Sequence, residues 1–276
     1  MLCGLLGVML AACSGPVAVP DSVSGTDSLP PALQVWAAFP ITASPRPLVI
    51  APGAGGSPDG PHGVYGDENV KEALLGGAFD RPAHLPAGPA TAGGYPIISA
   101  YKAFDLLKPN ADAVAGLRLT LTEARLGTAT FGTDRGEETL PAWLFSFARV
   151  DGPIPVLAVA PAARWFPSAL SGRNGDPSSA GAVVGPDHRT LTISFIGGQS
   201  GTGPCGVRYE VKLTESRTAV MVTRMSYHSN SYANNATVAC TLVGILRTAS
   251  AVLKTPLGAR VLVDDQGFPM GARGSP

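Results

Sequence analysis

The sequence predicts a β-rich α+β protein, with an antiparallel β-sandwich or barrel-like C-terminal body after a smaller mixed region that contains one or two short helices. From about residue 116 onward, apolar and polar residues alternate, which is typical of half-buried strands. These segments are short and regularly spaced, with turn residues between them, as in sandwiches and barrels. Apolar residues at helical spacing occur earlier in the chain, between residues 67 and 107.

The mixed region contains three predicted elements. The first is a short apolar strand that ends at Ile50, after two prolines. A helix follows, with Asp67 at or near its N-cap and Gly76-Gly77 as its stop. A second helix is expected over about residues 97–107, where apolar residues fall on one stripe before Lys108-Pro109 ends it.

The β region begins with a half-buried strand around Leu117–Thr122. A turn over 132–136 leads to a strand at about 139–149, and Asp151-Gly152 marks the next turn. The short strand at 154–160 contains Pro155, which places it at a sheet edge. Further strands are expected at about 190–195, 207–214, 219–226, 237–244, 247–253 and 259–264.

The N-terminus resembles a bacterial lipoprotein signal. Residues 1–12 are apolar and uncharged, and Leu10-Ala11-Ala12-Cys13 places small residues before a cysteine, as in a lipobox. In that family of signals the cysteine is diacylated, so Cys13 is the expected lipidation site and membrane anchor. No Lys or Arg precedes the apolar stretch, and we therefore expect the signal to be truncated at its N-terminus.

Four segments follow from these observations. Residues 1–12 are the signal segment, and 13–31 are the lipidated cysteine with a flexible tether rich in Pro, Ser and Gly. Residues 32–115 form the mixed α/β region, and 116–276 form the antiparallel β domain. Two lobes or one fused domain both fit the length of the chain.

The remaining cysteines predict one disulfide. Cys3 lies in the signal segment, which leaves Cys205 and Cys240 in a domain expected to be exported. The rival interpretation is a metal pair, but neither cysteine has a His or another Cys at ligand spacing. In the chain-entropy model, closing a loop of this length stabilises the fold by roughly 3–4 kcal/mol.

The charge balance limits the classes of partner. The chain has 20 basic and 20 acidic side chains and is only 14% charged, so its composition shows no electrostatic footprint for nucleic acid. No apolar run approaches the length of a membrane-spanning helix. The zero net charge favours a neutral small molecule, a glycan or a protein as the partner over an anionic wall polymer.

Residues around Ser200 carry the only catalytic alternative that we consider. Ser200, His188 or His228 and an Asp could form a nucleophilic triad, although the Gly-x-Ser-x-Gly frame fails because Thr202 occupies its last position. The nearby Gly201–Gly206 matches Gly-x-Gly-x-x-Gly, but a strand is expected after it where a nucleotide site needs a helix. A glycine loop that leads to a disulfide is the simpler interpretation.

The loop over residues 227–235 is the most site-like segment. It combines aromatic rings with amides, which suits the recognition of neutral polar ligands such as sugars. Its candidate ligand-binding residues are Tyr227, His228, Asn230 and Tyr232. A solvated hairpin loop is the alternative.

Other polar and aromatic groups have simpler explanations. Asp59, His62, Asp67 and Glu68 could hold a metal, but exposed loop positions explain them as well, and we predict no metal and no cofactor. The adjacent Asp264-Asp265 indicates a turn. Three aromatic residues share one face of a strand and are either core or a stacking platform for a sugar or lipid, namely Trp143, Phe145 and Phe147.

Several motifs are spread over most of the mature chain, namely Trp36, Leu140-Pro141-Ala142-Trp143, Cys205-Gly206, Cys240 and Arg247-Thr248. In these motifs the chain resembles uncharacterised lipoproteins and secreted proteins of high-GC Gram-positive bacteria (actinobacteria). The excess of 15 Arg over 5 Lys fits a GC-rich genome. The resemblance implies a place in the cell envelope but transfers no catalytic residue.

The sequence thus leaves three hypotheses of function. The leading one is a lipid-anchored, non-enzymatic binding or interaction module on the extracytoplasmic face of the cell membrane. The second is a cell-wall or ester hydrolase with a Ser-His-Asp set near Ser200. The third is a carbohydrate- or lipid-binding module.

Overall fold

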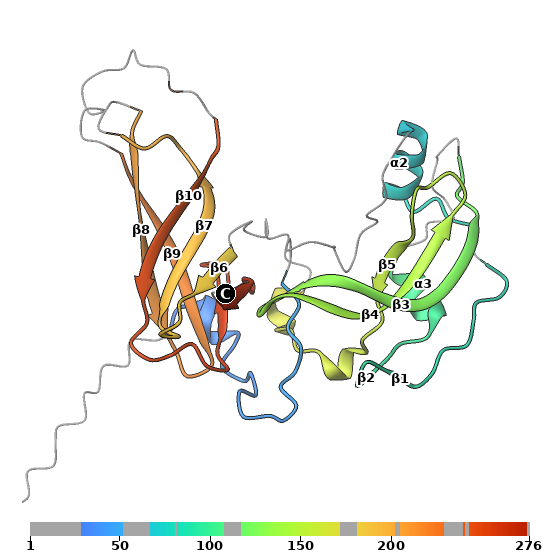
Figure 1. The fold of residues 1–276 in the computed structure, drawn as a ribbon, viewed down its shortest axis with the longest axis horizontal. Helices are drawn as coiled ribbons and strands as arrows, with labels where there is room; N and C mark the ends of the chain where they lie inside the picture. The colour runs from blue at the N-terminus through green and yellow to red at the C-terminus, as the bar shows by residue number, and fades with distance from the viewer. Residues whose placement is uncertain are drawn as a thin grey trace, which may run out of the picture.

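The computed structural model describes most of the chain beyond the tether. The described residues are 29–51, 67–80, 82–107, 117–171, 181–201, 205–228, 240 and 243–274. They form two lobes, a β-sandwich and a smaller sheet covered by helices (Figure 1). The predicted fold class is confirmed, since the chain is β-rich, its sheets are mostly antiparallel and its helices are few and short.

The sandwich is built from two sheets. Their strand orders are β10-β7-β6-β12 and β11-β9-β8. The strands are β6 (Gly181–Val184), β7 (Thr190–Gly197), β8 (Val207–Glu215), β9 (Ala219–His228), β10 (Ile245–Val252), β11 (Val261–Val263) and β12 (Ala272–Gly274). Alternate residues of the strands point inward, so Leu191, Ile193 and Phe195 of β7 pack in one core with Val220 and Val222 of β9.

Two short strands pair in parallel, which the alternation of residues did not predict. β11 runs parallel to β9, and β12 runs parallel to β6. The chain leaves β10 in one sheet, forms β11 in the other and returns to the first for β12. Such crossings between sheets allow a strand to enter beside a neighbour of the same direction.

The segment that follows the tether packs on the sandwich. Helix α1 (Pro31–Gln34) begins it, and Trp36, Phe39 and Val49 are buried against β9 and β11. The Trp36 indole N–H donates to the carbonyl of Gly267 at 2.8 Å. The expected strand before Ile50 consists of isolated bridges only. The predicted domain division near residue 115 stays a prediction. The packing of Trp36, Phe39 and Val49 on the sandwich shows a contact, but it does not show which segments fold as one domain.

The second lobe contains a sheet of order β3-β4-β5. Its strands are β3 (Leu121–Thr133), β4 (Gly136–Phe147) and β5 (Ile154–Leu157), and β5 is an edge strand, as Pro155 predicted. Helices α2 (Glu68–Leu75) and α3 (Ala100–Leu106) pack against one face of this sheet. Shorter elements are β1 (Thr91–Ala92), β2 (Tyr95–Pro96) and the 3-10 turns η1 (Pro161–Ala163) and η2 (Ser168–Leu170).

Both predicted helices are present, with their capping residues. The Asp67 carboxylate accepts the N–H of Asn69, and Gly77 follows α2 at φ +69°, where only glycine is unstrained. Helix α3 starts at Ala100, later than expected, because the Ser99 hydroxyl caps it by accepting the N–H of Lys102 at 3.3 Å.

The tip of the long β3–β4 hairpin joins the two lobes. Asp134 in its two-residue turn is buried, and its carboxylate pairs with Arg46, whose Nη1 donates at 3.2 Å. The Asp134 N–H donates to the carbonyl of Val49, and its carbonyl accepts from Ala272 next to β6. Figure 1 shows this hairpin reaching from the helix-covered lobe to the sandwich near the C-terminus.

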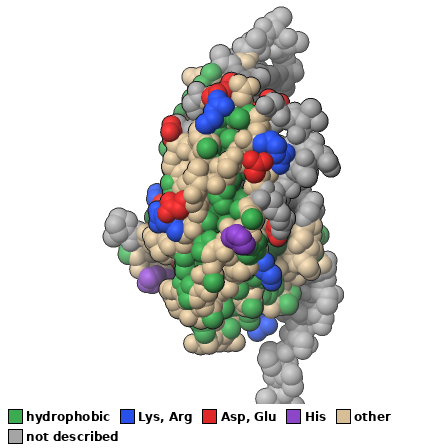
Figure 2. Space-filling view, turned by 90° about the vertical axis from the view of Figure 1, so that its right-hand side faces the viewer, with side chains coloured by type: hydrophobic (Ala, Val, Ile, Leu, Met, Phe, Trp, Pro, Cys, Tyr) green, Lys and Arg blue, Asp and Glu red, His purple; other side chains and the backbone are tan. Residues whose placement is uncertain are grey.

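Charged side chains are sparse on the lobe that carries α2 and β3–β5. Figure 2 faces this lobe and shows them as small groups, several of them of opposite sign, on a largely uncharged surface. Pairs such as Arg118–Asp80 at 3.0 Å and Arg149–Asp67 at 2.7 Å belong to this lobe. None of the helices in the described part of the chain has the length and apolar character needed to cross a membrane.

Candidate functional site

A disulfide marks one end of the sandwich. Cys205 precedes β8 and Cys240 precedes β10, and the two are joined as predicted, with their Cα atoms 5.5 Å apart. β8 and β10 are the edge strands of their two sheets. The disulfide therefore ties together the segments that lead into two facing edge strands.

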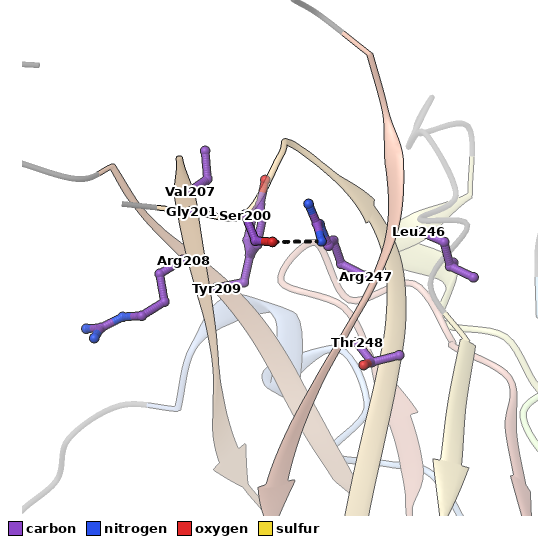
Figure 3. Close-up of a pocket in the computed structure, with 8 residues that line it drawn as sticks. All are labelled: Ser200, Gly201, Val207, Arg208, Tyr209, Leu246, Arg247 and Thr248. Carbon is purple, nitrogen blue, oxygen red and sulfur yellow. Dashed lines mark hydrogen bonds between the residues drawn. The ribbon is translucent and has the colours of Figure 1, made fainter. Parts of the chain in front are cut away.

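A cavity of about 460 Å³ opens at this end between β8, β10 and the turn after β7. Its lining residues are Ser200, Gly201, Val207, Arg208, Tyr209, Leu246, Arg247 and Thr248. In Figure 3, Ser200, Tyr209 and Arg247 converge, whereas Arg208 and Leu246 point away from them. The volume is in the range of small-molecule sites.

Arg247 is the central polar group of the cavity. Its Nε donates to the carbonyl of Gly198 at 2.9 Å, and its Nη1 donates to the Ser200 hydroxyl at 3.2 Å. Both acceptors are neutral. Three of the five N–H groups of this guanidinium thus have no partner among the described residues.

The turn after β7 is shaped by a close approach of Tyr209. The Tyr209 hydroxyl accepts the N–H of Gly198 at 2.6 Å. A Cβ at Gly197 would lie 2.8 Å from the Tyr209 ring, so this position needs glycine. The ring of Tyr209 also packs edge-on against Phe195, with centroids 4.9 Å apart.

Two further arginines lie at this end of the sandwich. The Arg224 guanidinium lies over the ring of Phe195, 5.0 Å from its centroid. Arg208 lies over the ring of Tyr227 at 5.6 Å and pairs with Glu210 at 3.1 Å. In the part of the chain that the structure describes, neither Arg224 nor Arg247 has a carboxylate within 4 Å, the limit for an ion pair.

The structure separates Ser200 from one of its two proposed histidines. His188 lies in the turn before β7 and Ser200 lies after the end of β7, so an eight-residue strand of roughly 25 Å separates them. The side chain of His228 lies outside what the structure describes. The hydroxyl of Ser200 contacts Arg247, a cation that cannot act as a general base. The triad thus stays a prediction that depends on His228 alone.

The glycine motif before β8 leads into a strand, as the sequence predicted. β8 begins at Val207 directly after Gly206, and no helix follows the motif whose N-terminus could meet a pyrophosphate. The Val207 N–H donates to the carbonyl of Gln199 at 2.9 Å. The motif is therefore a loop held between the end of β7 and the disulfide.

The loop predicted as most site-like is described only at its start. Tyr227 lies near the end of β9 and is 37% exposed, beside the cavity-lining Arg208. Asn230 and Tyr232, like the side chain of His228, lie outside the described residues. Their role in ligand binding stays a prediction.

The aromatic strand belongs to the core. Trp143, Phe145 and Phe147 are at most 3% exposed, and the Trp143 indole N–H donates to the carbonyl of Ile98 at 2.9 Å. The ring of Phe147 packs against Phe79, and the ring of Phe145 packs against Phe104. They offer no exposed stacking platform for a sugar or a lipid.

The acidic residues singled out in the sequence have structural partners. The carboxylate of Asp264 accepts the N–H groups of Gln266 and Phe268, which confirms a turn, and burial raises its pKa. Asp67 caps α2 and pairs with Arg149, whereas Asp59 and His62 lie outside the described residues. Within the described ranges, no group of three or more His, Cys, Asp or Glu side chains is placed to hold a metal ion.

In comparisons with known proteins, no family model, curated protein or solved structure matches the chain. The resemblance to envelope lipoproteins and the anchor at Cys13 therefore stay predictions. Cys13 itself lies outside the described residues.

Sequence reasoning missed Arg247 and Tyr209 as site residues. A partial signal was present, because residues 216–263 contain five Arg or Lys and no Asp or Glu, and two of the five, Arg224 and Arg247, lie at the cavity end. Residues 188–209 likewise contain two Arg and no acidic residue. The zero net charge of the whole chain conceals this local excess of positive charge.

Proposed function

We propose that the chain is a lipid-anchored, non-enzymatic binding module on the extracytoplasmic face of the cell membrane. Cys13 would carry the anchor, the segment up to residue 31 would act as the tether, and the described lobes would present the binding site. The Cys205–Cys240 disulfide supports an oxidising compartment, since such bonds persist mainly outside the cytosol.

The cavity between β8 and β10 is the observation that carries the binding function. It lies between two edge strands, and the disulfide joins the segments that lead into them. Its mouth adjoins Tyr227, where the loop predicted to bind ligand begins. A preformed cavity lined by a few convergent polar groups is typical of small-molecule and glycan sites.

The binding function is tested by blocking the cavity. A panel of envelope-derived sugars, peptides and small metabolites is screened by thermal unfolding against the full chain and two variants. Ser200→Trp places a bulky ring at the cavity, and Ser171→Trp adds the same ring at an exposed position outside it. We expect a compound that raises the melting temperature of the parent and of Ser171→Trp but not of Ser200→Trp.

A compound that stabilises all three proteins equally would place its site elsewhere, and a panel without any stabilising compound would count against a binding module. The anchor is tested separately by labelling cells with a radioactive fatty acid. Label is expected on the parent chain and absent from Cys13→Ala, and label that persists in the variant would contradict the anchor.

A further inference from the structure

We propose that the cavity between β8 and β10 binds its ligand through an oxyanion, a carboxylate or a phosphate, held by the guanidinium of Arg247. This inference rests on the proposed binding function and names the chemical class of the ligand. It departs from the neutral ligand that the net charge of the chain favours.

The local charge is the first step. Two of the described residues that line the cavity are charged, Arg208 and Arg247, and both are basic. The nearest acidic residue in sequence is Glu210, which already pairs with Arg208 at 3.1 Å. A ligand that carries an anionic group would thus meet an excess of positive charge.

The geometry of Arg247 is the second step. Two hydrogen bonds to neutral oxygens hold the guanidinium in place without cancelling its charge. The N–H groups that remain form a planar donor array, which matches the two oxygens of a carboxylate or phosphate. Because the side chain is held before a ligand binds, little rotamer entropy is lost on binding.

The neighbouring hydroxyls are the third step. Tyr209 and Ser200 both accept a hydrogen bond through oxygen, from Gly198 and Arg247 respectively. Each hydroxyl therefore keeps its own proton for donation. The convergent groups of the cavity are donors, and none of the described residues that line it carries a carboxylate that would repel an anion.

A structural role for Arg247, in which it merely holds the turn at Gly198, would need only the two hydrogen bonds observed. The test therefore compares anion binding with fold integrity. The full chain is produced with Cys13→Ser to prevent acylation and with its disulfide oxidised. Binding of inorganic phosphate, acetate and glucose is measured by titration calorimetry at pH 7 and constant ionic strength, and folding is monitored by near-ultraviolet circular dichroism.

We expect saturable binding of phosphate or acetate, and the stronger of the two identifies the oxyanion. Arg247→Gln should weaken this binding about tenfold or more, because a charge-assisted pair is lost. Arg247→Lys should retain part of it. The matched control is Arg217→Gln, which removes an exposed arginine from the turn between β8 and β9 at the other end of these strands and should change the affinity less than twofold.

Three results would overturn the inference: no saturable binding of either anion, equal binding by the parent and Arg247→Gln, or equal weakening by Arg217→Gln. If Arg247→Gln fails to fold, the same comparison is made with Arg247→Lys, which should then fall below the parent in affinity. A compound from the earlier panel that binds the cavity with unchanged affinity in the Arg247 variants would refute the oxyanion and leave the binding function intact.

Discussion

Arg260 at one end of the sandwich and Arg247 at the other end have different hydrogen-bond partners. At the end where β8 finishes and β11 begins, Arg260 is buried, donates to Glu215 at 2.8 Å and makes further bonds to three backbone carbonyls. Arg46 likewise pairs with the buried Asp134. At the end where β8 begins, Arg224 and Arg247 have no carboxylate within 4 Å in the described chain.

This difference separates structural arginines from available ones. Burial alone would raise the pKa of Glu215, but hydrogen bonds from Arg260 and from the N–H of Lys254 outweigh it and lower that pKa. The positive charge of Arg260 is thus neutralised by Glu215 within the fold. Arg247 contacts only neutral oxygens, so its charge remains for a ligand.

The largest effect is expected at Asp134. Asp134→Ala leaves the partly buried Arg46 without its counterion and should lower the free energy of unfolding by about 3–5 kcal/mol, measured by urea denaturation. The control is Glu123→Ala, which breaks an exposed pair with Arg125 and should cost below about 0.5 kcal/mol. Similar losses for the two variants would show that the hairpin tip does not stabilise the junction of the lobes.

Loss of the disulfide should cost nearly as much. The double variant Cys205→Ser/Cys240→Ser opens a loop with a sequence separation of 35 residues and should lose roughly 3–4 kcal/mol in the chain-entropy model. Urea denaturation of the variant and of the reduced parent should give the same midpoint. A parent that keeps its midpoint under reducing conditions would mean that the disulfide does not support this end.

A matched pair of variants compares how much Arg260 and Arg247 contribute to the free energy of unfolding. Arg260→Gln leaves Glu215 half-buried without its cation and should cost about 3 kcal/mol. Arg247→Gln removes two bonds to neutral acceptors and should cost about 1 kcal/mol or less. Equal losses of stability would contradict the assignment of Arg247 to ligand binding and make it a structural residue like Arg260.

The smallest effect concerns Asp187 in the turn before β7. Hydrogen bonds from Thr190 and from the N–H of Arg189 lower its pKa to about 2. Because this pKa lies below the unfolded value of about 3.9, its contribution to stability is present above that value and is lost as the pH falls through about 2. Carboxyl carbon NMR should follow this titration, and Thr190→Val should raise the pKa; a titration near 4 in the parent would show that the turn does not hold the carboxylate.

Local features of the fold could be predicted from the sequence, and long-range ones could not. Alternation predicted β7, β8, β9 and β10, Asp67 predicted the start of α2, and the two remaining cysteines predicted the disulfide. These features depend on neighbouring residues or on a small count. The parallel pairing of β11 with β9 and the packing of Trp36 on the sandwich depend on contacts between residues far apart in sequence. The periodicity of a single segment does not predict such contacts.

The candidate site shows the same limit. The sequence singled out Tyr227 and Ser200 because they stand in conspicuous local motifs, and the structure places them beside and in the cavity, while their role in binding stays a prediction. Arg247 stands in an ordinary strand pattern and becomes a site residue only because β10 brings it next to Gly198 and Ser200. The absence of acidic residues over 216–263 can be read from the sequence, but the zero net charge of the whole chain does not reveal it.

The central claim is that Arg247 can bind a ligand anion because it lines the cavity and has no carboxylate partner among the described residues, whereas Arg46 and Arg260 are paired with carboxylates. The most direct test follows the Nε–Hε resonances of Arg46, Arg247 and Arg260 by nitrogen-15 NMR during one titration with inorganic phosphate. We expect a saturable shift of Arg247 and no more than the bulk salt effect at Arg46 and Arg260. Equal shifts at all three arginines, or no shift at Arg247, would contradict the claim.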